Sequence, residues 1–355
     1  MVAESSVRSI QFTPRHAVWV TPVYDTYWKF AAKRQELFCR RVEGSPPPWT
    51  DDHIIQEHRF TNAYRAADRV SQYLIRNVIY SGSQSADEIV FRVLLFKFFN
   101  KIETWERLVK AIGMPSWATF KFDRYSKPLD DALAEKIAIY SAAYIMPSPA
   151  FGNVRKHQNH LQLLEHMMRQ RLPEQLESAD ALERVFAVIR TYPSMGDFLA
   201  FQYAIDLNYS ELLDFSEMDF VVAGPGAING ISKCFADTGG LSNADLIRAM
   251  ADRASEEFAR LGLTFHDLWG RPLQLIDCQN LFCEVDKYSR VAHPEFAGDS
   301  GRTRIKQRFV PNDRALPQWY PPKWNLTPPM TRQLVGTTTE RQPRRAVQLS
   351  LAFGT

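Results

Sequence analysis

Four polar side chains recur with helical spacing in residues 271–290, and they are the residues of this chain best suited to chemistry. They follow the i, i+3, i+7, i+10 pattern of one helix face: Asp277, Asn280, Glu284 and Lys287. A carboxylate can accept a proton, an amide can read a hydrogen-bonding edge, and an ammonium can hold an anion. The pattern predicts the wall of an active site, and its alternative is an ordinary solvated helix face.

An apolar seam runs along another side of the same predicted helix and would anchor it in the core. The seam repeats with the same spacing: Leu275, Cys278, Phe282 and Val285. Asn280 lies in the middle of this helix, although asparagine is a poor helix former. These features favour a buried helix whose polar face borders a cleft.

Arginines recur on a second predicted helix, which spans residues 58–80. One stripe of this helix carries amide and guanidinium groups: Asn62, Arg65, Arg69, Gln72 and Arg76. Planar guanidinium groups bind phosphate oxygens through paired hydrogen bonds, so the stripe predicts a phosphate-binding face. The alternative is a charged face exposed to solvent.

A third predicted helix, residues 154–172, places two histidines three positions apart. They are His157 and His160, and Lys156 lies beside them. Such a pair can bind a metal ion when a third ligand completes the site. The alternative is a pair of ordinary hydrogen-bonding histidines.

Helical patterns cover most of the chain, and no run of residues reads convincingly as a strand, so the predicted fold class is all-α. The expected helical segments are residues 24–41, 58–80, 86–113, 127–146, 154–172, 179–210 and 271–290. Residues 1–21 are expected to form an irregular lead-in, and residues 22–310 a helical catalytic domain. Residues 311–355 are rich in Pro and then in basic residues, and predict an extended, partly disordered tail.

The composition is that of an ordinary globular protein. Of 355 residues, 45% are hydrophobic and 23% are charged, and the net charge is +3. Any affinity for nucleic acid must therefore come from a local basic patch. Four scattered cysteines suit a reducing compartment. We expect no signal peptide, no membrane contact and a cytoplasmic location, because no apolar run is long enough for a leader or a membrane span.

A glycine turn at Gly224, Pro225 and Gly226 predicts two helices joined by a tight hairpin, at about residues 212–236. The spacing resembles the helix-hairpin-helix motif of DNA repair glycosylases. In that motif the N–H groups of the second helix hold a DNA phosphate, and Lys233 could add a charge. Ile228 stands where lyase-type glycosylases carry their Schiff-base lysine, and Asp245 only loosely matches their later acidic signature.

Longer segments carry a more specific resemblance. They are FTNAYRAADRVSQYLI, FKFFNKIETW, AYIM with the following RKHQNHL, DFLAFQYAIDLNYS, AGPGAINGISKCF and LIDCQNLFCEVDKYSR. From about Pro22 to about Trp324 the chain resembles the alpha-glutamyl/putrescinyl thymine pyrophosphorylases, or amino acid:DNA transferases, of DNA-hypermodifying bacteriophages. A sister branch forms the helical domain of 5-hydroxymethyluracil DNA kinases. Kinase activity itself is not supported, because no GxxxxGK[ST] loop occurs here.

The resemblance implies a fold, a reaction and partners. The fold would be glycosylase-like and helical. The substrate would be double-stranded DNA in which an upstream kinase has phosphorylated 5-hydroxymethyluracil. The enzyme would flip that base out and replace its (pyro)phosphate with an amine, supplied by an amino acid such as glycine or glutamate or by a polyamine. If the protein is phage-encoded, this would take place in the host cytoplasm.

Such a reaction needs a cationic clamp for the leaving group and a base for the incoming amine. The predicted clamps are Arg65, Arg69 and Lys287, with Lys156 and His157 in reserve. A divalent metal ion such as Mg²⁺ could share this task. Glu284 is the leading base, and the runners-up are Asp206 and Asp277.

The flipped uracil needs an amide that reads its edge and an aromatic ring that stacks on it. The predicted readers are Asn280, Gln279 and Asn62, and the predicted stacking residues are Tyr64, Tyr203 and Tyr288. Cys283 could add to the ring as a thiolate, or could be a small packing residue. Two other readings stay open: a glycosylase that excises a modified pyrimidine, and a non-catalytic DNA-binding subunit.

Overall fold

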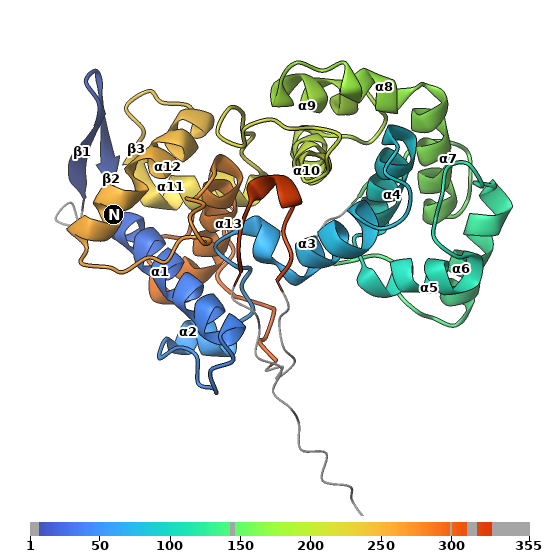
Figure 1. Cartoon of the computed structure of the whole chain (residues 1–355). Coiled ribbons are helices and arrows are strands. Elements are labelled where there is room, and N and C mark those ends of the chain that lie inside the picture. The colour runs from blue at the N-terminus through green and yellow to red at the C-terminus, as the bar shows by residue number, and fades with distance from the viewer. Residues whose placement is uncertain (1–6, 143–145, 299, 311–317, 329–355) are drawn as a thin grey trace, which may run out of the picture.

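The computed structural model describes residues 7–142, 146–298, 300–310 and 318–328, and it is mostly helical, as the sequence predicts. Its elements form two groups (Figure 1). One group holds α1 (Pro22–Val42), α2 (His53–Glu57), α11 (Pro225–Cys234), α12 (Asn243–Arg260) and α13 (Leu275–Ala292). The other holds α4 (Ala86–Phe99), α5 (Ile102–Ile112), α6 (Phe122–Ala134), α7 (Lys156–Arg169), α8 (Leu172–Glu177), α9 (Leu182–Arg190) and α10 (Asp197–Asn208).

A small antiparallel sheet corrects the expectation that residues 1–21 are irregular and that the fold is purely α. β1 (Arg8–Thr13) pairs with β2 (His16–Val20), and β2 pairs with β3 (Phe235–Asp237). Burial alternates along β1, because one face of the strand packs on the core while the other meets solvent. The third strand lies more than 200 positions away in the sequence, so the hairpin has support that no local pattern could reveal.

The centre of the first group is α13, which packs against α1, α11 and α12. Its seam of Leu275, Cys278, Phe282 and Val285 is fully buried, as the sequence predicts. α1 begins where Pro22 favours a helix start, and the hydroxyl of Thr21 caps it by accepting from the amide of Val23. Helices from the two ends of the chain, α1 and α13, therefore pack against each other in the core.

Residues 58–80 do not form the single helix that their composition predicts. They divide into an extended loop, a 3-10 turn η2 (Arg65–Ala67), α3 (Arg69–Tyr73) and the π-helical η3 (Leu74–Ile79). Tyr64 and Asp68 both have extended backbone, which interrupts the helical ladder. Arg65 is consequently buried while Arg69 and Arg76 are exposed, so the predicted arginine stripe does not exist.

The segment 86–113 ends at Gly113 as predicted, but it contains two helices. Asn100 adopts a left-handed conformation between α4 and α5 and turns the chain. Proline and glycine also mark the gap between α9 and α10. The expected helix at 127–146 instead starts earlier, at Phe122, and ends at Ala134.

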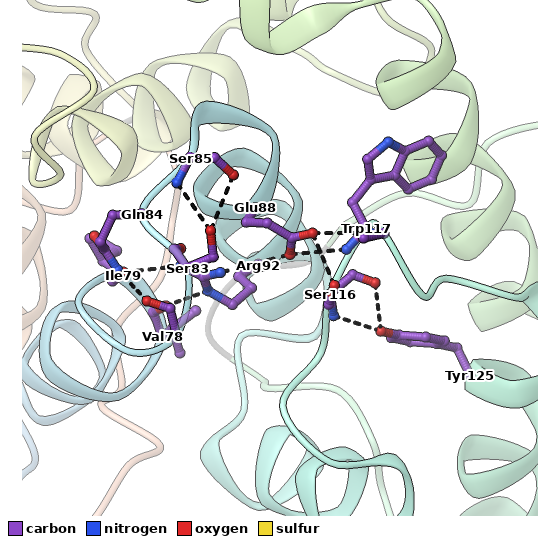
Figure 2. Close-up of polar contacts among 12 residues, drawn as sticks. Val78, Ile79, Ser83, Gln84, Ser85, Glu88, Arg92, Ser116, Trp117 and Tyr125 are labelled. Carbon is purple, nitrogen blue, oxygen red and sulfur yellow. Dashed lines mark hydrogen bonds and ion pairs between the residues drawn. The ribbon is translucent and has the colours of Figure 1, made fainter.

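Two buried charges hold the start of α4 against its neighbouring loops (Figure 2). Arg92 is 1% exposed and donates to three carbonyl oxygens of the preceding loop: those of Val78, Ile79 and Ser83. Glu88 accepts from three groups of another loop: the Ser116 hydroxyl and the amides of Trp117 and Ala118. Arg92 therefore serves three backbone carbonyls, and Glu88 serves two backbone amides and one hydroxyl.

The helix-hairpin-helix expected at about 212–236 is only half present. α11 is its second helix, but residues 211–224 are not helical, and Gly224 has an ordinary φ of −74°. The glycines serve close packing instead. A Cβ at Gly224 would lie 2.5 Å from the ring of Phe198, and one at Gly230 would lie 2.1 Å from the carbonyl oxygen of Phe282. α11 and α13 therefore approach each other at a distance that only glycine permits.

Gly230→Ala is expected to destabilise the protein by about 1–3 kcal/mol or more, because α11 and α13 must separate to admit the methyl group. Chemical denaturation followed by circular dichroism would measure the loss. Gly226→Ala is the comparison, since its methyl group would meet the movable side chain of Cys283 at 3.1 Å rather than backbone. Equal stability of the two variants would contradict this account of the helix contact.

Much of the predicted tail, residues 311–317 and 329–355, lies outside the described residues. Residues 318–328 are described, and they include the short 3-10 helix η4 (Pro322–Trp324). In Figure 1 this segment is drawn in red between α13 and α10.

Candidate functional site

The polar stripe of α13 fixes a loop, residues 60–68, that runs along the helix. Asp277 Oδ1 accepts from the amide of Arg65 at 2.8 Å. Asn280 Nδ2 donates to the carbonyl of Asn62 at 3.2 Å, and Glu284 Oε2 accepts from the amide of Thr61 at 2.9 Å. Three of the four stripe residues therefore satisfy backbone groups of one loop, which explains why an amide and two acids occur on a buried helix face.

Lys287, the fourth stripe residue, pairs with its neighbour. Its Nζ lies 2.7 Å from Glu284 Oε2, and it also donates to the carbonyl of Arg59. The side chain of Lys287 is 18% exposed, so this end of the stripe stays near the surface. The hydroxyl of Tyr288 donates to Asp52, and its ring packs against Phe30 rather than standing free for stacking.

The loop carries Arg65 into a buried ionic cluster that joins the two groups of helices. Arg65 Nη1 lies 2.8 Å from Asp206 Oδ1, and Lys97 Nζ lies 3.1 Å from Asp206 Oδ2. Burial alone would raise the pKa of Asp206, but the two cations outweigh it and hold that pKa below its usual value. The structure thus joins Arg65, Asp206 and Asp277 in one buried network, in which Arg65 contacts both acids.

A cavity of about 290 Å³ opens at the start of α13, beside this cluster. Its walls come from three parts of the chain: the loop after α10, the residues before α13, and the segment 318–328. The polar and aromatic side chains that matter here are Glu217, Arg271, Gln274, Lys323 and Trp324. The cavity borders the residues directly before α13, Arg271 and Gln274, but no residue of the α13 stripe lines it.

Two opposite charges face each other in this cavity. Arg271 Nη2 donates to Glu217 Oε2 at 3.0 Å, and the guanidinium lies 3.9 Å above the ring of Trp324. Glu217 is only 4% exposed, and its Oε1 has no hydrogen-bond partner among the described residues. Burial raises the pKa of Glu217, although the nearby Arg271 opposes that rise. A carboxyl group with a raised pKa in a cavity is a candidate proton acceptor.

Asp277 lies directly behind this pair, at the first turn of α13. Burial, and then the charge of Glu217, raise the pKa of Asp277 from 3.8 to about 7. Its second oxygen accepts from the amide of Gln274, so it also caps the helix. Glu217 in the cavity and the buried Asp277 are thus two interacting carboxyl groups, and each holds its proton more strongly than a free one does.

Asp277→Asn is expected to change how stability depends on pH. The folded protein keeps a proton on Asp277 up to about pH 7, whereas the unfolded chain loses it near 3.8. Wild-type stability therefore falls as pH rises through this window, and the variant lacks that fall. Urea unfolding at several pH values would show the stability difference between the two proteins narrowing towards pH 7. A constant difference would refute a titrating Asp277.

The predicted base readers lie mostly in packed surroundings. Asn62 is buried, its side chain accepting from Arg34 and donating to the carbonyl of Ala67. Gln279 is buried and donates towards the sulfur of Cys283. Burial raises the pKa of Cys283 to about 12, so a thiolate is disfavoured at neutral pH.

The predicted stacking tyrosines are also packed in the interior. Tyr64 and Tyr203 are both buried. The hydroxyl of Tyr64 donates to the carbonyl of Arg271, at the edge of the cavity. Tyr203 instead contacts the sulfur of Met146.

The reserve phosphate ligands and one clamp lie in the second group of helices, away from α13. Arg69 is exposed and pairs with Glu103. Lys156 lies over the ring of Tyr140, and His157 is buried 3.1 Å from Asp130. These residues are not part of the cavity.

Of the residues predicted to hold the DNA backbone, Gly224 and Lys233 are buried, Gly226 packs against Cys283, and Pro225 is exposed. Gly224, Pro225 and Gly226 form the first turn of α11, where Phe198 and Cys283 fill the space beside the glycines. The prediction that Lys233 binds a DNA phosphate is wrong, because its ammonium is fully buried and pairs with Asp286 at 3.0 Å. A lysine in that position is not available to a phosphate on the surface.

Sequence reasoning missed Glu217, Lys323 and Trp324 as site residues. Glu217 lies in a loop of mixed polarity and follows no period, and the other two belong to the Pro-rich segment that reads as tail. Arg271 was within reach, since it opens the stretch that contains the stripe.

The described residues offer neither a metal-binding cluster nor a membrane-spanning helix. Among residues 7–142, 146–298, 300–310 and 318–328, no group of three or more His, Cys, Asp or Glu side chains is placed to hold a metal ion. Within the same ranges no helix is long and apolar enough to cross a membrane.

The sequence of this chain is similar to those of known proteins. The sequence model of the family "5-hmdU DNA kinase, helical domain" matches residues 21–298. A curated relative, the 5-hmdU DNA kinase of Bacillus phage SP10, is 26% identical over 289 residues. That match covers 75% of this chain but 45% of the kinase, so the chain spans less than half of its relative's length. No solved structure matches this chain.

Proposed function

Because this chain belongs to the family of the 5-hmdU DNA kinase helical domain, we propose that it acts in the hypermodification of phage DNA. The proposed enzyme is a transferase that replaces the (pyro)phosphate of a 5-(pyro)phosphomethyl-deoxyuridine in DNA with an amine. Its partners are double-stranded DNA carrying that base, an amino acid or polyamine, and an upstream kinase, in the host cytoplasm. Kinase activity is not proposed, since the sequence contains no GxxxxGK[ST] loop.

The observation that supports a transferase is the pair of Glu217 and Arg271 in a cavity at the start of α13. An amine attacks only as its neutral form, so a nearby group must take up its proton. Glu217 suits this role because its pKa is raised and one of its oxygens has no partner among the described residues. Arg271 suits a phosphate because a guanidinium offers several N–H donors in one plane.

The proposed step is a substitution at the 5-methylene carbon of the base. The nitrogen lone pair of the amine forms the new C–N bond as the C–O bond to the phosphate breaks. The (pyro)phosphate leaves with the electron pair of that C–O bond and is held by Arg271. The extra proton of the amine passes to the carboxylate of Glu217. Glu217 thus replaces Glu284 as the proposed base, because Glu284 is held by Lys287 and the amide of Thr61.

Product mass tests the proposal. The full chain is incubated with DNA that contains phosphomethyl- or pyrophosphomethyl-uracil and with glycine, glutamate or putrescine in turn. The reactions are run with Mg²⁺ and with a chelator, and the DNA is digested to nucleosides and weighed. An amine adduct supports the transferase. Free base with abasic DNA would indicate a glycosylase, and unchanged DNA that stays tightly bound would indicate a non-catalytic subunit.

A further inference from the structure

Residues 318–328, here called the strap, lie outside the family match at 21–298 and yet complete the cavity. The strap begins against η3 and α3, where the amide of Trp319 donates to Gln72 and the ring of Trp319 packs edge-on against Tyr80. It then reaches Arg271, just before α13, so it lies between the two groups of helices (Figure 1). One wall of the proposed active site is therefore supplied by a separate segment of the chain.

Lys323 fastens the strap beside the loop that carries Glu217. Its ammonium donates to the carbonyls of Asn208 and Ser210, both at 2.8 Å, and to that of Leu213. The first of these carbonyls ends α10, where a cation also complements the helix dipole. The side chain of Lys323 is 11% exposed, and its three protons are used by these three carbonyls, so it acts as a fastener rather than as a free charge.

The indole ring of Trp324 packs against one face of the Arg271 guanidinium. The guanidinium carbon lies 3.9 Å from the centre of the indole ring, which is itself packed edge-on against Tyr209. Glu217 holds one end of the guanidinium through Nη2. A planar cation fixed on its face and at one end keeps its remaining N–H groups in a defined direction, so less rotational freedom is lost when an anion binds.

We propose that Trp324 is a positioning residue that orients Arg271 for the phosphate group in the cavity, and that the strap is the element that supplies it. This inference rests on the proposed function for the identity of the phosphate. The contact between Trp324 and Arg271 is independent of the proposed function. The strap thereby adds a recognition element that the family-matched region alone does not contain.

Trp324→Ala tests the inference in the full chain. We expect the KM for phosphomethyl-uracil DNA, and the Kd for inorganic pyrophosphate measured by calorimetry, to rise by roughly 10-fold, the size of a desolvated cation–π contact. kcat should change less, because Trp324 touches no reacting atom. Trp324→Phe keeps an aromatic face and should restore most of the affinity.

Trp319→Ala is the matched control, since it removes the same side chain from the same strap without touching Arg271. Weaker pyrophosphate binding by Trp324→Ala, with Trp319→Ala near wild type, supports the inference. Equal losses in the two variants, or no recovery with Trp324→Phe, would mean that the strap only adds stability.

Pyrophosphate binding also separates this inference from the proposed function. A wild-type protein that forms no adduct but binds pyrophosphate in a Trp324-dependent way would retain the inference and remove the transferase. If the wild-type protein forms adducts and Trp324→Ala forms them with unchanged kinetics, the transferase is retained and the inference about Trp324 is removed. Absence of pyrophosphate binding by the wild-type protein would overturn the inference.

Discussion

Glu217→Gln is expected to lower the rate of adduct formation roughly 100- to 10,000-fold, the contribution typical of a general base. Glutamine keeps the size of the side chain but cannot accept the proton of the amine. It can still accept a hydrogen bond from Arg271, so the cavity should keep its shape. The rate is measured by the mass of the nucleoside product under single-turnover conditions, with DNA binding measured in parallel.

Glu284→Gln is the matched control for this prediction, because it makes the same change at a buried glutamate of α13 that lies outside the cavity. Glu284 holds the amide of Thr61 and the ammonium of Lys287, and it does not line the cavity. Its substitution should reduce stability more than turnover. If Glu284→Gln abolishes transfer while Glu217→Gln leaves it intact, the base has been assigned to the wrong glutamate.

Asp206→Asn is expected to cause the largest loss of stability, about 3–5 kcal/mol, because it leaves two buried cations without their anion. Arg65 and Lys97 would then share an uncharged amide in the interface between the two groups of helices. That is a large part of the stability of an ordinary domain, so we expect a large fraction of the variant to be unfolded. Urea unfolding followed by circular dichroism measures the change.

The same substitution has a pH signature. The pKa of Asp206 is lowered in the folded state, so its contribution is present at neutral pH and is lost as pH falls through that lowered value. The stability gap between wild type and Asp206→Asn should therefore close in acid. Asp131→Asn is the control, since its exposed pair with Lys127 is worth about 0.5 kcal/mol or less. A small loss in Asp206→Asn, similar to that of the control, would contradict the role of the cluster.

Elements with strong local signals could be predicted from the sequence. Pro22 begins α1, Gly113 ends α5, and the apolar seam of α13 is buried. In each case the determining contact lies within one or two turns of the residue, where a sequence pattern can register it.

Elements whose partners are distant in sequence could not. The β1–β2 hairpin depends on β3, and the loop at 60–68 depends on α13. Residues 58–80 have a helix-forming composition, but side chains elsewhere hydrogen-bond to their backbone and prevent a continuous helix. The same holds for the candidate site. Asp277 could be predicted from the stripe, but Glu217 comes near it only through the fold.

The contacts between α13 and the loop at 60–68 have a consequence for how the chain assembles. Thr61 and Glu284 are separated by 223 positions, and Arg65 and Asp277 by 212. Contacts of such long range require a large loop to close before they form. We therefore expect the loop to take its final shape late in folding, once α13 has docked beside it.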